Sequence, residues 1–187
     1  MANIYNPTKD EEILTPFSPI LGYKKMSDVF VEKCNKAIDD KMEDWSGNLV
    51  GKVKEELKWN DDYRLEIASS WFVRQYEHEY NPIHVHLGSM LSCVGYLQLP
   101  EGIEEEWEED DKGHHPSHGH IQFVYGHAAN HTGSNFLLKP RVGHFIVFPA
   151  HLHHCVYPFK TVGERRSFSV NFTIAASPKE LSNEPNN

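Results

Sequence analysis

The segment from Glu164 to Phe172, with the sequence ERRSFSVNF, alternates polar and apolar side chains from Ser167 onward. Successive side chains of a β-strand point to opposite faces of the sheet. One face would therefore carry Arg166, Phe168, Val170 and Phe172, and the other Arg165, Ser167, Ser169 and Asn171. The segment predicts a strand whose polar face is either solvated or lines a polar cavity.

Strand-forming segments continue upstream of this one, separated by Gly, Pro and Asn. They cover residues 65–73, 83–87, 90–99, 120–125, 135–139, 144–149, 154–159 and 165–174. No useful helical period separates them, so a parallel βαβ sheet is not expected. The sequence predicts a mainly β fold, with the double-stranded β-helix (a cupin-like jelly roll) as the leading candidate.

The part of the chain before these strands has a different texture. Three prolines in residues 1–26 indicate an extended arm. Ser27 is placed to cap a helix over about 28–42, and a weaker helical pattern covers 48–58. We expect a single domain over 1–187, made of the arm (1–26), a helical part packed outside the sheet (27–60), a jelly-roll core (65–174) and a flexible tail (175–187).

Composition narrows the classes of partner. The net charge of −9 argues against nucleic acid as the main partner, and no apolar run is long enough for a membrane span. The three cysteines lie far apart, which favours reduced thiols in a cytoplasmic protein. A homodimer would form through an exposed sheet edge or the arm.

The window from Glu101 to Asp111 holds eight acids and no base, and histidines follow it. We expect residues 101–119 to form a long surface loop with Trp107 exposed.

Two histidine motifs have the spacing of metal ligands. In NPIHVH (81–86), His84 and His86 would share one strand face, with Cα atoms about 6.6 Å apart, and their rings can converge on one ion. In PAHLHH (149–154), a turn offers three histidines, one of which can be a third ligand. Taken alone, the first motif is as typical of two half-buried strand histidines as of a metal site. The second motif alone is as typical of solvent-facing loop histidines as of a metal ligand.

The strand of residues 165–174 adds a third motif. Arg165 and Ser167 place a forked cation beside a hydroxyl, and such a pair can hold a carboxylate by charge-assisted hydrogen bonds. By itself the pair is more typical of an ordinary solvated face.

Together the three motifs resemble the 2-oxoglutarate/Fe(II)-dependent oxygenase superfamily, and more narrowly its prokaryotic and phage-type group. The resemblance covers about 70–174 and is carried by Trp71 and residues 81–97, 148–158 and 163–171. It implies that the metal ligands are His84, His86 and His154, and that Arg165, Ser167 and Tyr96 bind the distal carboxylate of 2-oxoglutarate.

The second ligand departs from the broad superfamily, which has Asp or Glu where this chain has His86. A site of three histidines is neutral, holds Fe(II) less firmly and would tolerate other divalent ions. Glu77 or Glu79 is a weak candidate for a missing carboxylate.

The resemblance implies an Fe(II)- and 2-oxoglutarate-dependent dioxygenase. It would hydroxylate an unidentified substrate and couple C–H oxidation to decarboxylation of 2-oxoglutarate to succinate, with no catalytic residue beyond the metal centre. Two alternatives stay open: a cupin-like three-histidine metalloenzyme without 2-oxoglutarate, and a non-catalytic jelly-roll binding module.

Overall fold

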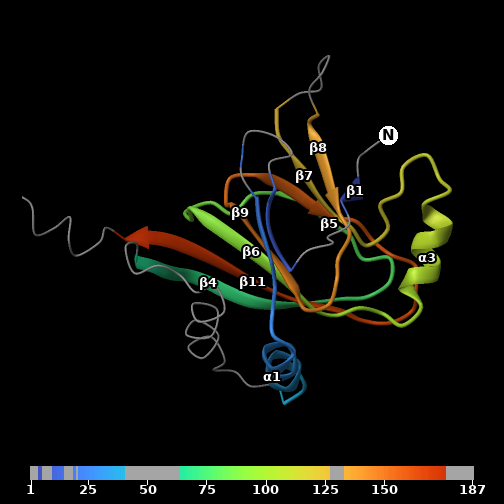
Figure 1. The fold of residues 1–187 in the computed structure, drawn as a ribbon, viewed down its shortest axis with the longest axis horizontal. Coiled ribbons are helices and arrows are strands. Elements are labelled where there is room, and N and C mark those ends of the chain that lie inside the picture. Colours follow the sequence, from blue (N-terminus) through green and yellow to red (C-terminus); the bar gives the residue numbers. More distant parts are fainter. Residues whose placement is uncertain are drawn as a thin grey trace, which may run out of the picture.

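Two β-sheets form the body of the molecule (Figure 1), in a computed structural model that describes residues 4–5, 10–14, 19, 21–40, 64–126 and 133–175. The larger sheet has the spatial order β2 (Glu11–Leu14), β3 (Leu21–Lys25), β9 (His144–Pro149), β6 (Leu91–Gln98), β11 (Arg165–Ala175) and β4 (Arg64–Gln75). The smaller sheet has the order β1 (Ile4–Tyr5), β8 (Asn135–Leu138), β7 (Ile121–Val124), β10 (His153–Val156) and β5 (Asn81–His84). The pairs are antiparallel except β1 with β8, and the predicted mainly β, jelly-roll class is confirmed.

Each of the eight predicted segments contains a strand. The predicted and observed bounds differ most at two strands. β5 is Asn81–His84 where 83–87 is predicted, and β10 ends at Val156 where the prediction ends at 159. The residue after next is Pro158, which has no N–H to continue a strand ladder.

Helix α1 (Asp28–Asp39) begins where the sequence predicts, because the Ser27 hydroxyl accepts a hydrogen bond from the Phe30 N–H at 3.3 Å. Its apolar stripe packs against one face of the larger sheet, outside the two sheets as expected (Figure 1). The buried residues of this contact include Phe30, Val31, Cys34, Cys93, Leu97, Phe168 and Val170. The helical pattern over 48–58 and the tail from 176 lie outside the described residues.

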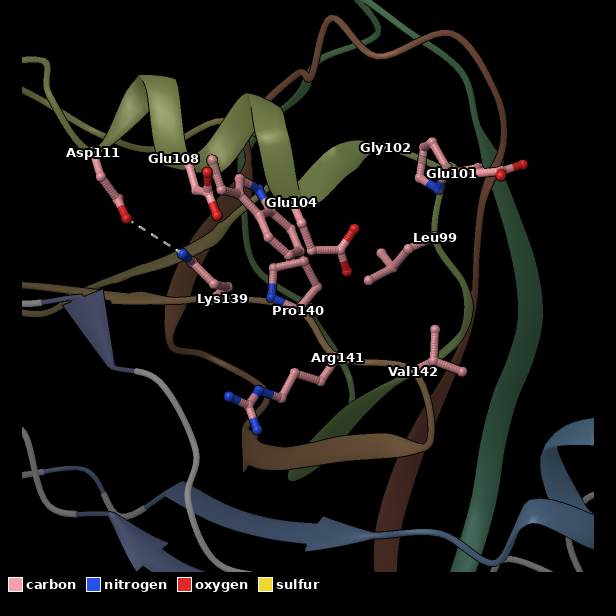
Figure 2. A pocket seen from close by; sticks show the side chains of 12 residues that line it. Leu99, Glu101, Gly102, Glu104, Glu108, Asp111, Lys139, Pro140, Arg141 and Val142 are labelled. Carbon is pink, nitrogen blue, oxygen red and sulfur yellow. Dashed lines mark ion pairs between the residues drawn. The ribbon is translucent and has the colours of Figure 1, made fainter.

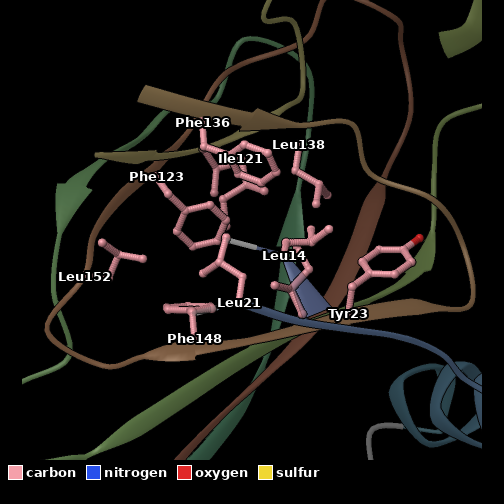
Figure 3. Close-up of a cluster of buried hydrophobic side chains, with 11 residues drawn as sticks. Leu14, Leu21, Tyr23, Ile121, Phe123, Phe136, Leu138, Phe148 and Leu152 are labelled. Atoms are coloured by element: carbon pink, nitrogen blue, oxygen red, sulfur yellow. The ribbon is translucent and has the colours of Figure 1, made fainter. Parts of the chain in front are cut away.

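The space between the sheets holds a second apolar cluster (Figure 3). Its members include Leu14, Leu21, Tyr23, Ile121, Phe123, Phe136, Leu138, Phe148 and Leu152. Burying each such side chain stabilises the fold by about 1.5–3 kcal/mol. Part of the expected arm therefore belongs to the core, because β3 pairs with β9 and brings Leu21 and Tyr23 into this cluster.

The expected loop over 101–119 is wrong in its first half, which forms helix α3 (Ile103–Asp110). Ile103 and Trp107 lie one helical turn apart and are buried with Phe159, so Trp107 is only 6% exposed. The sequence pattern missed the helix because two apolar residues within a run of acids give no visible stripe. No helix in the described part of the chain is long and apolar enough to cross a membrane.

Candidate metal and co-substrate site

A cavity of about 290 Å³ contains all six residues predicted for the site. The histidine cluster (His84, His86, His154) and the donor group (Tyr96, Arg165, Ser167) both line it. The rest of its wall is formed by Trp71, Val73, Asn81, Ser92, Cys93, Val94, Ile121, Phe148, Val156 and Ser169. Among these lining residues there is no Asp or Glu, so Arg165 gives the cavity a positive charge.

The pairing of β5 with β10 brings the histidine cluster together, because His84 lies directly opposite His154. One ring nitrogen of each of the three residues lies within 4.8 Å of the other two, and the Nε2 atoms of His86 and His154 are 3.2 Å apart. Two nitrogens bonded at about 2.1 Å and at right angles to one ion would be about 3 Å apart. The spacing therefore fits ligation of a single divalent metal.

Backbone carbonyls orient two of the three rings. The Nδ1 of His84 lies 2.7 Å from the Pro82 carbonyl oxygen, and the Nδ1 of His154 lies 2.9 Å from that of Leu152. An Nδ1–H that donates to a carbonyl leaves the Nε2 lone pair for a metal. Burial lowers the pKa of His154 to about 4. The pKa of His86 is also lowered, mainly by burial and to a smaller extent by repulsion from His84. Neutral imidazoles are the form that binds metals.

The other histidines of the turn do not join the cluster, since the side chains of His151 and His153 are exposed. The two glutamates considered as further ligands are occupied elsewhere. Glu77 accepts a hydrogen bond from the Gly163 N–H, and Glu79 accepts one from the Tyr76 N–H. Among the described residues, the group that could hold a metal ion therefore contains three imidazoles and no carboxylate.

Arg165 is buried, with 2% of its surface exposed, and two residues hold its guanidinium. Its Nη1 donates to the Gly119 carbonyl at 2.8 Å, and its Nη2 donates to the side-chain oxygen of Gln75. Its Nε is buried without a hydrogen-bond partner among the described residues, none of which forms an ion pair with it. Burial lowers the pKa of Arg165, yet a guanidinium stays charged. Because a buried cation without a counter-charge is costly, the cavity favours an anionic ligand.

Tyr96 and Ser167 complete the donor group from neighbouring strands, where they face each other across the β6–β11 pair. The Tyr96 hydroxyl is buried and has no partner among the described residues. Burial raises the pKa of Tyr96 to about 12, so the phenol stays protonated and can donate. A carboxylate in this cavity would satisfy the free Nε, the phenol and the Ser167 hydroxyl, so the residues present fit 2-oxoglutarate as well as a metal.

Helix α3 holds the backbone segment whose carbonyl accepts a hydrogen bond from Arg165. The Asp110 carboxylate accepts the backbone N–H groups of Ser117 and His118, at 2.6 and 2.9 Å. The next residue is Gly119, whose carbonyl receives Arg165. Glu106 of the same helix accepts hydrogen bonds from Lys160 and Thr161. The acidic segment therefore fixes the loop that orients the guanidinium.

Two polar contacts of the site were not predicted. Gln75 lies opposite Arg165 in the β4–β11 register, and Asn171 places its Nδ2 3.2 Å from the Nδ1 of His86. Asn171 shares the polar strand face of Arg165 and Ser167, so the alternation alone could have found it. Gln75 could not be found in this way, because its role depends on which strand pairs with β11.

A larger cavity, of about 680 Å³, lies beside α3 and residues 139–142 (Figure 2). Acids of the segment 101–111 line it, and the Lys139 Nζ is 3.7 Å from an Asp111 oxygen. It contains none of the six predicted residues.

Comparison with known proteins agrees with this chemistry. A family model described as "Putative 2OG-Fe(II) oxygenase" matches residues 69–171, more than half of the chain. A search of curated proteins finds no match.

Several solved structures are similar to this chain. HygX from Streptomyces hygroscopicus, solved with nickel and 2-oxoglutarate bound, is 10% identical over 82% of this chain and 81% of its own, with a TM-score of 0.55. A 2OG-Fe(II) oxygenase-family oxidoreductase from Burkholderia pseudomallei is 13% identical over 87% and 72%, with a TM-score of 0.45. The viral collagen prolyl hydroxylase of Paramecium Bursaria Chlorella virus-1 is 15% identical over 88% and 96%, with a TM-score of 0.46. The HygX match shows a shared fold, and the family match shows that this chain belongs to the 2OG-Fe(II) oxygenases, enzymes that use Fe(II) and 2-oxoglutarate.

Proposed function

We propose that this enzyme hydroxylates a C–H bond of its substrate and that the six predicted residues form its cofactor site. In this proposal the histidine cluster holds Fe(II), and the donor group binds the distal carboxylate of 2-oxoglutarate. One observation carries the assignment: a single cavity is lined by three converging imidazoles and by a buried guanidinium with an unpartnered Nε. The primary substrate is not specified by these residues.

The charges of the cavity support a dianionic co-substrate. Arg165 contributes one positive charge, imidazoles that bind a metal are neutral, and a divalent metal adds two more. The two carboxylates of 2-oxoglutarate offset most of this charge. Because Gln75 and Gly119 already occupy two guanidinium nitrogens, the arginine is oriented before the ligand arrives, which reduces the entropic cost of binding.

With both cofactors bound, the iron centre supplies the oxidative chemistry that converts 2-oxoglutarate to succinate and CO₂ and hydroxylates the substrate. The chain contributes position and shielding. Its imidazoles fix the metal, its donor group fixes the diacid, and the side chains of Ile121, Phe148 and Val156 form apolar walls that limit water in the cavity.

An anaerobic absorption spectrum tests the assignment. Fe(II) and 2-oxoglutarate added to the wild-type protein should give a weak visible charge-transfer band. We expect Arg165→Ala to lose the band at 2-oxoglutarate concentrations that saturate the wild type, while still binding metal. An unchanged band in Arg165→Ala would remove Arg165 from its role.

The cupin-like alternative is favoured by one observation, the lack of a carboxylate in the metal-binding group of the described residues. It gives no reason for a buried arginine in the same cavity that has no ion-pair partner among the described residues. Absence of the band in the wild type, together with intact metal binding, would favour this alternative.

Other expectations from the sequence are kept as proposals: a single domain, a cytoplasmic location, no nucleic acid as main partner and a homodimer. The three cysteines are free and buried, which supports a reducing compartment.

A further inference from the structure

Asn171 is the polar residue in contact with the ring nitrogen of His86 that faces away from the other histidines. The side chain is 7% exposed and lies between three partners. Its Nδ2 is 3.2 Å from the His86 Nδ1 and 3.1 Å from the Ser69 hydroxyl, and its Oδ1 accepts the Ser92 hydroxyl at 2.8 Å. The Nδ1 of His84 and of His154 lies against a nearby backbone carbonyl, whereas the Nδ1 of His86 lies against the Asn171 amide.

The orientation of this amide determines the tautomer of His86. An Nδ2 that donates to the His86 Nδ1 requires a lone pair there, which places the imidazole proton on Nε2. That proton then points to the Nε2 of His154, 3.2 Å away. A His86 that binds a metal through Nε2 carries its proton on Nδ1 instead, and this N–H needs an acceptor. Reversing the amide by 180° supplies one, the Asn171 Oδ1.

The surrounding hydroxyls allow the reversal without loss of a hydrogen bond. Ser69 and Ser92 each have a hydroxyl that can donate or accept. After reversal, Ser69 and the His86 Nδ1–H donate to Oδ1, while Nδ2 donates to Ser92. The same three partners therefore serve both amide orientations.

We propose that Asn171 is a positioning residue that couples the His86 tautomer to metal binding: its amide donates to Nδ1 in one state and accepts from Nδ1–H when His86 ligates through Nε2. This inference rests on the proposed three-histidine metal site. Asn171 is not among the three proposed ligands, so it would act through His86.

Two substitutions separate an acceptor role from a merely structural one. Asn171→Asp keeps the shape and can only accept, so at pH 7.5 it should fix the proton of His86 on Nδ1 and bind zinc no more weakly than the wild type. Asn171→Leu keeps similar bulk without an acceptor, and its zinc affinity should fall about 10–100-fold. Ser69→Ala, which leaves the Asn171–His86 contact intact, is the matched control and should lose less than Asn171→Leu.

Zinc affinity is measured by competition with a chelating dye, and the tautomer by long-range ¹H–¹⁵N NMR, with His86 assigned from its missing signals in His86→Ala. In chelator-treated protein we expect Nε2–H in the wild type and Nδ1–H in Asn171→Asp. Equal losses of affinity in the Asp and Leu variants, or the same tautomer in the wild type and the Asp variant, would overturn the inference. If Asn171→Leu fails to fold, the His86 tautomer in Asn171→Asp compared with that in the wild type still tests the inference.

His154→Ala separates this inference from the proposed metal site. A wild-type protein that binds zinc no better than His154→Ala would overturn the metal site itself. Zinc binding lost in His154→Ala but normal in Asn171→Leu would overturn the role of Asn171 alone.

Discussion

The two halves of the cavity are held in place by different parts of the chain. In the histidine cluster, His84 and His154 are oriented by the carbonyls of Pro82 and Leu152, each two residues earlier in sequence. In the donor group, Arg165 is oriented by Gly119 and Gln75, which are 46 and 90 residues away. Two of the three rings in the proposed metal half are therefore oriented by residues nearby in sequence, although the cluster itself needs the pairing of β5 with β10. The guanidinium of the proposed co-substrate half is oriented by residues far away in sequence. Substitutions should therefore affect the two proposed halves separately.

Removing a ligand should damage the metal half most. We expect His154→Ala to weaken Fe(II) binding at least about 100-fold, since the site loses one of three ligands. His151→Ala and His153→Ala are matched controls from the same turn, and their exposed side chains should change the affinity little. Anaerobic metal titration measures all three, and equal losses would mean that the ligand of this turn is misassigned.

Removing the guanidinium should damage only the co-substrate half. Arg165→Ala should raise the Kd for 2-oxoglutarate about 100-fold or more, because charge-assisted hydrogen bonds contribute about 1.5–3 kcal/mol each. Calorimetry on the metal-loaded protein measures this, with Arg165→Lys as a variant that keeps the charge without the fork. A parallel loss of metal affinity would show that the halves are not independent.

Loosening the arginine without removing it should give an intermediate effect. Gln75→Ala takes away one partner of a buried cation, and we expect about a tenfold higher Kd for 2-oxoglutarate with unchanged metal affinity. The same calorimetry applies. A normal Kd would mean that Gly119 alone is sufficient to orient Arg165.

The smallest effect concerns the acid that precedes Arg165. Hydrogen bonds from Arg74 and Arg166 lower the pKa of Glu164 to about 2. A lowered pKa means that the ionised carboxylate stabilises the fold above about pH 4.5, and that this contribution is lost as the pH falls toward 2. Glu164→Gln should therefore cost about 1 kcal/mol of unfolding free energy at pH 7, after allowance for solvent screening.

Urea denaturation at several pH values measures that difference. It should shrink steadily below about pH 4.5, and a difference that stays constant down to pH 3 would contradict the assigned cause.

The contrast between the halves also explains what could be predicted from the sequence. H-x-H spacing and strand alternation are local patterns, so the sequence predicts eight of the strands, the capped helix and the polar face of β11. The partners of Arg165 were not, because Gln75 and Gly119 reach it only through strand pairing and loop packing. The sequence does not predict the helix at 103–110, because Ile103 and Trp107 give no visible stripe in a run of acids and their buried partner Phe159 lies far along the chain.

Helix α3 gives the acidic segment a structural role that its composition does not suggest. Through Asp110 and the loop of Ser117 and His118, this surface tract is linked to the backbone oxygen that receives Arg165. Trimming or neutralising these acids to improve handling of the protein would remove a support of the proposed co-substrate pocket. We expect a shortened variant to bind 2-oxoglutarate less well before its metal affinity falls.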